Sequence, residues 1–303
     1  MNSADIPAGS PAAPRAAASD SPLRRGLRIF LGNKWAVCCS VIVLLFMLMA
    51  IFAPWIAPHD PNESDLLVRL QPPAWISGDW GYILGTDGQG RDLLSRIIYG
   101  SRISIFIGAA VISIATAVGI AIGLVAGYFG GWIDAIISRV IDVLLAFPYL
   151  LFAIGLMAMM GPGLQNIILT LAYKEWVIPC RLVRGETLAA KRLEYVEAAL
   201  AVGASPGYIM RKEILPNILS PVLVVSTIRM AYVIILEASL SFLGIGVQPP
   251  TASWGSIVAD GRSLLLSAWW ISTFSGLAIL ILVLAINIAS QGLRDAFDPR
   301  LQE

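Results

Sequence analysis

Charged side chains are scarce in this sequence. Only 14% of its 303 residues are Asp, Glu, Lys or Arg, whereas 57% are hydrophobic, and the mean hydropathy is +0.77. A soluble domain of average composition carries about 25% charged residues. This deficit excludes an ordinary soluble protein and predicts that the chain is a membrane protein.

The residue types that most often perform metal or nucleophilic chemistry are also nearly missing. His59 is the only histidine, and the three cysteines (Cys38, Cys39 and Cys180) lie in apolar stretches without metal-ligand spacing. We interpret the cysteines as small hydrophobic residues. There is no HExxH motif and only one histidine to act as a general base, so a membrane-embedded enzyme is a minor alternative. No Gly-Lys dipeptide occurs either, which excludes a P-loop for nucleotide phosphates.

Long uncharged runs are what the sequence does contain. A helix needs about 20 mostly apolar residues to cross a hydrocarbon core of about 30 Å. The runs predict an all-α polytopic membrane protein in which a tight turn at Gly161-Pro162-Gly163 joins the third and fourth spans. The six predicted transmembrane helices cover about 35–58, 103–128, 134–160, 164–183, 221–236 and 263–292.

The distribution of basic residues predicts the orientation. An even number of spans places both termini on one side, and with the N-terminus inside, fourteen of the 21 Lys and Arg residues fall in cytoplasmic segments and five outside. The positive-inside rule therefore predicts cytoplasmic N- and C-termini. The predicted organisation is a disordered tail rich in Ala, Pro and Ser, an N-terminal segment with the first span, a periplasmic segment, a core and a C-terminal tail, at 1–22, 23–60, 61–100, 101–295 and 296–303.

The cytoplasmic loop over 185–216 is too regular in pattern for a flexible linker. Helix formers are dense over 186–202, and Gly203 stands where a helix C-cap favours a left-handed residue. Ser205 and Pro206 then predict the start of a second short helix, which we expect to run to about Leu215 and end before Pro216.

This helix–glycine–helix element is suited to docking on a partner, because small residues such as Ala198 and Ala199 permit close approach. An amphipathic helix resting on the membrane surface is the alternative. Three parts of the loop resemble the "EAA…G…LP" motif of permeases in bacterial ABC importers. They are Glu197-Ala198-Ala199, Gly203 and Leu215-Pro216. In that family, the loop is the coupling helix that sits in a cleft of the ATPase subunit, which implies an ATPase-coupling role for these six residues.

The resemblance extends over about 24–300, and it is to the C-type permease of dipeptide, oligopeptide and nickel importers. The further motifs that match this subgroup, in order, are Leu84-Gly85-Thr86-Asp87, Gly90-Arg91-Asp92, Ser95-Arg96, Gly100-Ser101-Arg102, Gly127-Tyr128-Phe129-Gly130-Gly131, Ser241-Phe242-Leu243-Gly244, Gln248-Pro249-Pro250, Trp254-Gly255, Gly292-Leu293-Arg294-Asp295 and Asp298-Pro299. It implies the type I importer permease fold, with a five-helix core and an additional N-terminal helix, in a bacterial inner membrane.

The same resemblance implies the partners. These are a second homologous permease, two ATPase subunits, a periplasmic or lipid-anchored solute-binding protein and membrane lipid, with no nucleic acid. This chain itself is expected to be no enzyme and to hold no cofactor, because ATP and Mg²⁺ would bind the separate ATPase subunits.

Charged residues inside predicted spans are candidates for a translocation path. A charge at mid-membrane costs roughly 2.5–3.5 kcal/mol on insertion scales, so it usually faces a cavity or an ionic partner. The candidates are Lys174, Glu175, Arg229 and Glu237. They either line a polar path or pair with one another to hold the helices together, and the sequence favours neither.

Three further features lead to structural expectations. Gly119, Gly123 and Gly127 form two GxxxG steps, which predict close helix packing within the chain or against a partner, with a pore-lining groove as the weaker alternative. The outer segment over 84–102 is expected to form, together with 241–268, the surface that meets the binding protein. The tryptophans at 254, 269 and 270 fit interfacial anchoring.

The predicted function is that of a permease subunit of an ATP-driven importer, which forms half of the path for short peptides or similar small solutes. An ion-gradient-driven secondary transporter is the alternative, and it would usually show an internal repeat, which is not evident. The spans do not separate dipeptides from oligopeptides, nickel chelates, glutathione or opines.

Overall fold

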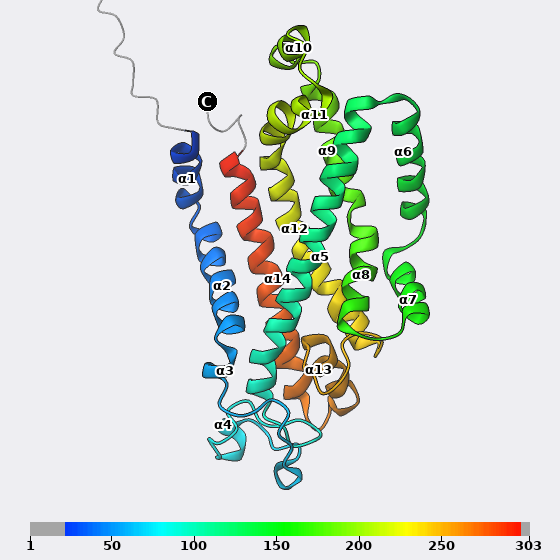
Figure 1. Cartoon of the computed structure of the whole chain (residues 1–303). Coiled ribbons are helices and arrows are strands. Elements are labelled where there is room, and N and C mark those ends of the chain that lie inside the picture. The colour runs from blue at the N-terminus through cyan, green and yellow to red at the C-terminus, as the bar shows by residue number, and fades with distance from the viewer. Residues whose placement is uncertain (1–21, 298–303) are drawn as a thin grey trace, which may run out of the picture.

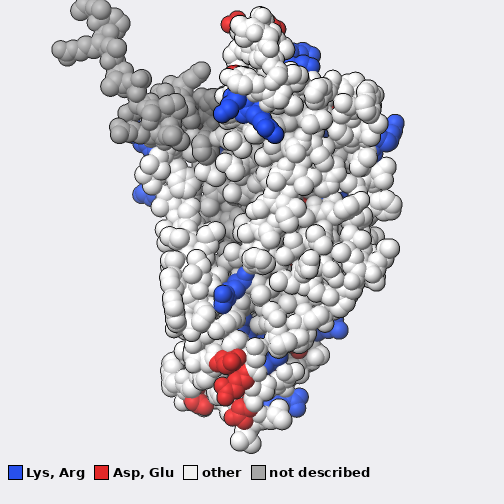
Figure 2. Space-filling model, viewed as in Figure 1, with Lys and Arg blue, Asp and Glu red and all other residues white. Residues whose placement is uncertain are grey.

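The computed structural model describes residues 22–297, and the regular elements over that range are all helical. The all-α prediction is therefore confirmed. The helices form an elongated bundle (Figure 1). The tails predicted over 1–22 and 296–303 lie almost wholly outside the described residues. On the face drawn in Figure 2, charged side chains gather mainly toward the two ends of the bundle, and the surface between them is largely uncharged.

Within residues 22–297, four helical segments are long and apolar enough to cross a membrane. They are α2 (Lys34–Ile51), α5 (Leu93–Phe129), α12 (Leu215–Phe242, with the turns that lead into it) and α14 (Trp269–Phe297). Helix α1 (Pro22–Gly32) precedes α2, and the side chain of Asn33 caps the junction by accepting a hydrogen bond from the Ala36 N–H at 3.2 Å.

The prediction of one continuous helix over 134–160 is wrong. The chain forms α6 (Gly131–Ala146) and α7 (Tyr149–Met160), which meet at an angle of 91°. Pro148 explains the break, because proline pushes the preceding residue out of the helical region, and Phe147 is extended. This pair counts as a fifth apolar segment by composition, so the count of six spans stays a prediction.

The predicted fourth span corresponds to two helices in near-continuous sequence. α8 (Leu164–Glu175) and α9 (Val177–Ala190) are separated only by Trp176, whose backbone is itself helical. α9 runs further toward the loop than expected. The remaining short elements are α3 (Ala53–Ile56), η1 (Leu66–Val68), α4 (Ala74–Ser77), α10 (Glu194–Ala201), α11 (Pro206–Tyr208), the π-helical turn η2 (Ile209–Ile214), α13 (Trp254–Gly261) and η3 (Arg262–Leu264).

The glycine stripe of α5 packs against α9 of the same chain. A Cβ atom added at Gly119 would lie 2.9 Å from the Trp176 carbonyl oxygen, and one at Gly123 would lie 2.7 Å from the Cys180 carbonyl oxygen. A Cβ at Gly127 would lie 2.7 Å from the Thr187 Cβ. The stripe is thus the seam along which two backbones approach closely, as expected for small residues between membrane helices.

Buried charges and tryptophans hold together the end of the bundle that carries α13, which is the predicted outer end. Asp87 accepts a hydrogen bond from Arg91 Nε at 2.7 Å and lies 3.4 Å from Arg96 Nε, and Asp260 of α13 lies 3.7 Å and 3.8 Å from the same two arginines. Residues 84–102 are predicted from the sequence to form part of the surface that meets the binding protein. Asp87 and Arg96 of this segment are buried, so these two residues are not available for docking. Burial raises the pKa of Asp260 despite the two arginines.

The expectation of interfacial anchoring is wrong for two of the three tryptophans. Trp254 and Trp270 are buried, and their indole N–H groups donate to the carbonyl oxygens of Ile97 and Thr86 at 2.9 Å and 3.1 Å. A buried indole needs such a partner. Of these three tryptophans, Trp269 alone is exposed.

Candidate coupling loop and intramembrane polar cluster

The loop between α9 and α12 projects beyond one end of the bundle. Figure 1 shows α10 and α11 at the same end as α1 and the last turn of α14, and opposite α13. This is the arrangement expected if the loop and the termini share one side of the membrane. That this end faces the cytoplasm stays a prediction.

A single buried side chain anchors α10. Val196 is fully buried, in a cluster with Ala190 of α9, Ile209 and Ile214 of η2 and Ile218 of α12. The rest of α10 is directed outward: among the predicted coupling residues, Glu197 and Ala198 are exposed and Ala199 is half-buried. The helix is therefore fixed on its inner face and free to contact a partner with its outer face.

Gly203 ends α10 as predicted. Its φ is +80°, in the left-handed region that favours glycine. The Gly203 N–H donates to the Leu200 carbonyl oxygen and the Ala204 N–H donates to the Ala199 carbonyl oxygen, both at 3.0 Å. These two bonds form a Schellman motif, so the glycine makes a defined turn and not a loose hinge.

The second half of the loop differs from the prediction. Ser205 caps α11 by accepting a hydrogen bond from the Tyr208 N–H at 3.4 Å, as expected, but the helix does not end before Pro216. It continues through the π-helical turn into α12, with Pro216 in the first turn of α12. A proline ring clashes with the carbonyl four residues earlier in an α-helix, and the wider turn relieves that clash. The Asn217 side-chain amide donates a hydrogen bond to the Glu213 carbonyl oxygen in this turn at 2.6 Å.

Two polar contacts fix the other end of the loop to the bundle. Lys191 donates through Nζ to the carbonyl oxygen of Tyr128, near the end of α5, at 2.6 Å, and its ammonium group lies 5.3 Å from the Tyr128 ring centroid. Arg184 of α9 forms a two-bond ion pair with Asp134 of α6. Both ends of the loop are thus held by helices, so a force on α10 would be transmitted to them.

The structure brings three of the four candidate path residues together. Arg229 of α12 donates through Nε and Nη2 to the two carboxylate oxygens of Glu175 at the end of α8. The guanidinium lies over the Tyr232 ring, 4.2 Å from its centroid. Glu175 is buried, whereas 23% of the Arg229 side chain is exposed. This is the interhelical pairing left open by the sequence, and it joins α8 to α12.

Lys174 holds the broken span in place. Its ammonium group donates to the carbonyl oxygen of Phe147, the residue at the break between α6 and α7. It also lies 5.2 Å from the ring centroid of Tyr149 and 5.5 Å from that of Phe152. The lysine thereby satisfies a carbonyl that the break frees, in an aromatic setting that favours a cation.

Glu237 belongs to a separate site nearer the outer end of α12. It is fully buried, and its two carboxylate oxygens accept hydrogen bonds from Ser104 of α5 at 3.0 Å and from Ser241 at 2.8 Å. Ser241 in turn accepts a hydrogen bond from the Val247 N–H at 3.2 Å. Glu237 therefore connects α5, α12 and the loop that follows it.

Several of these contacts could not be found from the sequence. Tyr149 and Tyr232 surround the cations, and their rings pack edge to face at 5.8 Å. The Asp134–Arg184 pair and the Lys191–Tyr128 contact join residues 50 and 63 positions apart. One sequence offers no signal for such distant pairs beyond the presence of opposite charges in different spans.

Comparison with known proteins agrees with the helical fold and the projecting loop described above. Residues 119–303 match the family model of the binding-protein-dependent transport system inner membrane component, and residues 21–73 match that of the N-terminal TM domain of oligopeptide transport permease C. The chain belongs to this permease family. It is accordingly an inner membrane permease subunit of an ABC importer, and not an enzyme, since ATP hydrolysis is the task of a separate subunit.

Two relatives resemble the permease over nearly its whole length. The dipeptide transport system permease protein DppC of Escherichia coli K12 is 44% identical over 284 residues, which cover 93% of this chain and 95% of the relative. The di/tripeptide transport system permease protein DppC of Pseudomonas aeruginosa is 40% identical over 283 residues and 93% of both chains.

A solved structure agrees on the fold. A chain of the inward-facing MetNI methionine ABC transporter superposes with a TM-score of 0.56 at 18% identity, covering 68% of the permease and 98% of that chain. The predicted type I importer permease fold is confirmed by this match, which at such low identity concerns the fold alone. Membership of the family implies that the permease assembles with other importer subunits. It does not identify those subunits.

Proposed function

We propose that this permease forms half of a translocation path that carries short peptides into the cell, and that α10 couples the path to ATP hydrolysis. It pairs with a second homologous permease, two ATPase subunits that bind ATP and Mg²⁺, and an external solute-binding protein. The N- and C-termini and the loop face the cytoplasm. The choice of peptides rests on the names of the two relatives, both peptide permeases.

The observation that supports the coupling role is the construction of the loop. α10 presents Glu197 and Ala198 outward, is anchored by Val196, and ends in a Schellman turn at Gly203. On the far side the chain continues into a helical segment that runs from Pro206 to Phe242. A partner that moves α10 therefore moves α12 with it, because no flexible joint separates them.

A movement of the coupling loop would be transmitted through α12 to the intramembrane polar cluster around Arg229. Arg229 lies about 21 Å along the helix from Leu215, estimated from a rise of about 1.5 Å per residue. A shift of α12 would move Arg229 relative to Glu175 on α8 and strain the ion pair between them. We infer that this pair and the Lys174 contact hold one arrangement of the helices, and that Arg229, which is partly exposed, is the group of this cluster accessible to a passing solute.

Charge reversal in the loop tests the coupling role. Glu197→Arg is expected to abolish both copurification of the ATPase subunits and peptide uptake, because it reverses an exposed charge on the docking face. Glu63→Arg makes the same change of charge at an exposed position of the outer end and is expected to preserve both. Retention of ATPase subunits and full uptake by Glu197→Arg would show that α10 is not the coupling element.

Uptake by the reconstituted complex tests the substrate and the energy source separately. With its binding protein and ATP, the complex is expected to import dipeptides or tripeptides. Import of a nickel chelate in place of peptides would refute the substrate class and leave the coupling role intact. Uptake driven by an imposed ion gradient without ATP would instead support the secondary transporter.

A further inference from the structure

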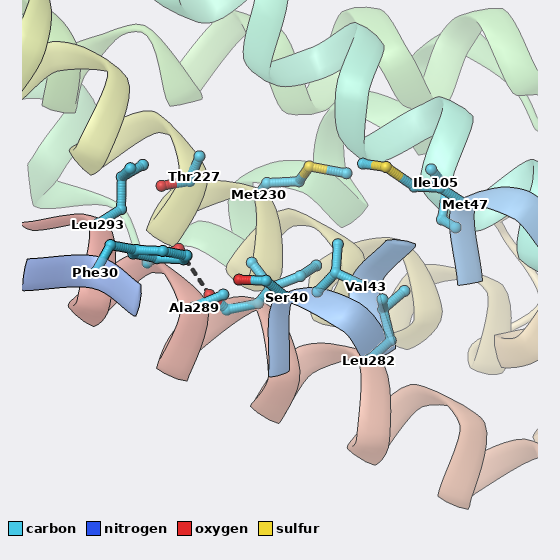
Figure 3. A pocket seen from close by; sticks show the side chains of 12 residues that line it. Phe30, Ser40, Val43, Met47, Ile105, Thr227, Met230, Leu282, Ala289 and Leu293 are labelled. Atoms are coloured by element: carbon cyan, nitrogen blue, oxygen red, sulfur yellow. Dashed lines mark hydrogen bonds between the residues drawn. The ribbon is translucent and has the colours of Figure 1, made fainter. Parts of the chain in front are cut away.

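An apolar cavity of about 210 Å³ lies between the N-terminal helices and the rest of the bundle. Figure 3 shows it extending from Phe30 of α1 and Leu293 of α14 at one end to Met47 of α2 and Ile105 of α5 at the other. Met230 of α12 also lines the space. It is separate from the loop and the polar cluster described above.

The chemistry of the lining excludes a polar ligand. The three hydroxyl groups on the cavity wall donate their hydrogens to carbonyl oxygens of their own helices: Ser40 to Ala36 at 2.8 Å, Thr227 to Val224 at 2.7 Å and Ser290 to Ile286 at 2.7 Å. The other lining residues are apolar. An apolar cavity of about 150 Å³ already stays dry and admits apolar ligands, so this larger one suits a hydrocarbon.

The dimensions match one leaflet of a bilayer. On α14 the lining extends from Leu282 to Leu293, which is about 16 Å at a rise of about 1.5 Å per residue. Half of a hydrocarbon core is about 15 Å. The helices that supply the lining, apart from α1, are the four apolar enough to cross a membrane. The cavity is therefore oriented along the direction of a lipid chain.

The end of the cavity near Phe30 has a basic surface. Among the described residues there, Lys34, Arg28 and Arg294 are exposed, and so is the carboxylate of Asp295. Each basic residue near a membrane surface attracts anionic lipid by about 1 kcal/mol. The predicted orientation places this end at the cytoplasmic leaflet.

We propose that this cavity is a binding site for one acyl chain of an anionic phospholipid of the cytoplasmic leaflet, with the phosphate near Lys34 and Arg294. The bound lipid fills the space between α2 and the core formed by α5, α12 and α14. The lipid thereby stabilises the packing of α2 against the part of the chain that carries the coupling loop. The leaflet rests on the proposed orientation, whereas the site itself does not.

Photolabelling of the intact importer complex tests the site directly. A phosphatidylglycerol probe with a diazirine near the end of one acyl chain is expected to label peptides that contain Met47 or Met230, and a matched phosphatidylcholine probe is expected to label them less. Labelling confined to the outward face of α2, around Leu44 and Leu45, would overturn the proposal.

Filling the cavity gives a second test. Native mass spectrometry of the delipidated wild-type complex is expected to find one phospholipid retained. Ala289→Leu adds three carbons to the cavity wall and is expected to remove it. Ala117→Leu adds the same carbons at an exposed position of α5 and is expected to retain it. Equal lipid retention by the two variants would contradict the site.

The headgroup and the rival occupants are tested last. Lys34→Gln with Arg294→Gln is expected to remove the preference for phosphatidylglycerol over phosphatidylcholine, and an unchanged preference would refute the assigned headgroup contacts. Photoreactive methionine at 230 is expected to crosslink to lipid. A crosslink to residues 1–21 of this chain or to another subunit would show that a protein segment occupies the cavity. None of these readouts depends on the transported solute or on ATPase binding.

Discussion

Arg229 of α12 and Glu175 of α8 form a two-bond ion pair between residues 54 positions apart. Glu175 is buried, so removing only the arginine leaves an uncompensated charge in a medium of low dielectric constant. The pair joins α12, which continues from the coupling loop, to α8, which ends at Glu175.

The first prediction concerns this pair. Arg229→Met alone is expected to destabilise the subunit by roughly 3–5 kcal/mol, whereas Arg229→Met with Glu175→Met is expected to cost clearly less. Thermal unfolding of the four members of this double-mutant cycle in detergent gives the coupling energy. Additive losses would mean that the pair does not hold the helices. A stable Arg229→Lys variant that loses uptake would instead support the path role.

A second prediction concerns the seam between α5 and α9. Gly123→Ala places a Cβ at 2.7 Å from the Cys180 carbonyl oxygen, so the helices must separate. We expect a loss of about 1–3 kcal/mol, as for overpacked cores, measured by thermal unfolding. Gly185→Ala on α9 meets nothing within 4 Å and is expected to be neutral or stabilising by up to about 1 kcal/mol. Similar behaviour of the two variants would argue against close packing.

The outer charge cluster leads to a third prediction. Asp87→Asn removes the carboxylate nearest two arginines, of which Arg96 is buried, and is expected to cost roughly 3–5 kcal/mol. Asp260→Asn serves as the matched control, because the Asp260 side chain is 52% exposed and such pairs contribute about 1 kcal/mol or less. Protease resistance of the outer segment reports both effects. Equal protease resistance of the two variants would contradict the role of Asp87 as the main partner of the two arginines.

Asp260 also predicts a pH dependence. Partial burial of this carboxyl group raises its pKa above the ordinary value of 3.8, so the folded state favours the protonated form. The resulting stabilisation is complete below pH 3.8 and is lost as the pH rises through the raised pKa. Relative to Asp260→Asn, the wild type is therefore expected to lose stability over this interval in thermal unfolding. A relative gain with rising pH would mean that the arginines dominate.

The last prediction separates docking from transmission. Lys191→Met removes the bond to the Tyr128 carbonyl oxygen but leaves the outer face of α10 unchanged. ATPase subunits are expected to copurify normally, while the peptide imported per ATP hydrolysed falls. Lys191→Arg, which keeps the charge and a donor, should restore most of the coupling. Loss of ATPase association in Lys191→Met would assign this lysine to docking itself.

The prediction that failed most clearly shows the limit of hydropathy. The run over 134–160 is apolar enough for one span, yet it bends by 91° at Phe147 and Pro148. Proline alone does not decide between a kinked span and a break, because α12 passes through Pro221 without interruption. Lys174 stabilises the break at Pro148, because its ammonium group donates a hydrogen bond to the Phe147 carbonyl oxygen.

The sequence by itself determined the class of protein, the positions of most helices, the left-handed turn at Gly203 and the family, because apolar length, glycine geometry and short motifs are local properties. The tertiary structure alone decided that the glycine stripe faces α9, that Glu175 binds Arg229 while Glu237 binds serines, and that the motif charges at 87 and 96 are buried. These outcomes depend on which helices become neighbours. A single sequence does not encode that locally, since many pairings of apolar helices satisfy the same hydrophobic pattern.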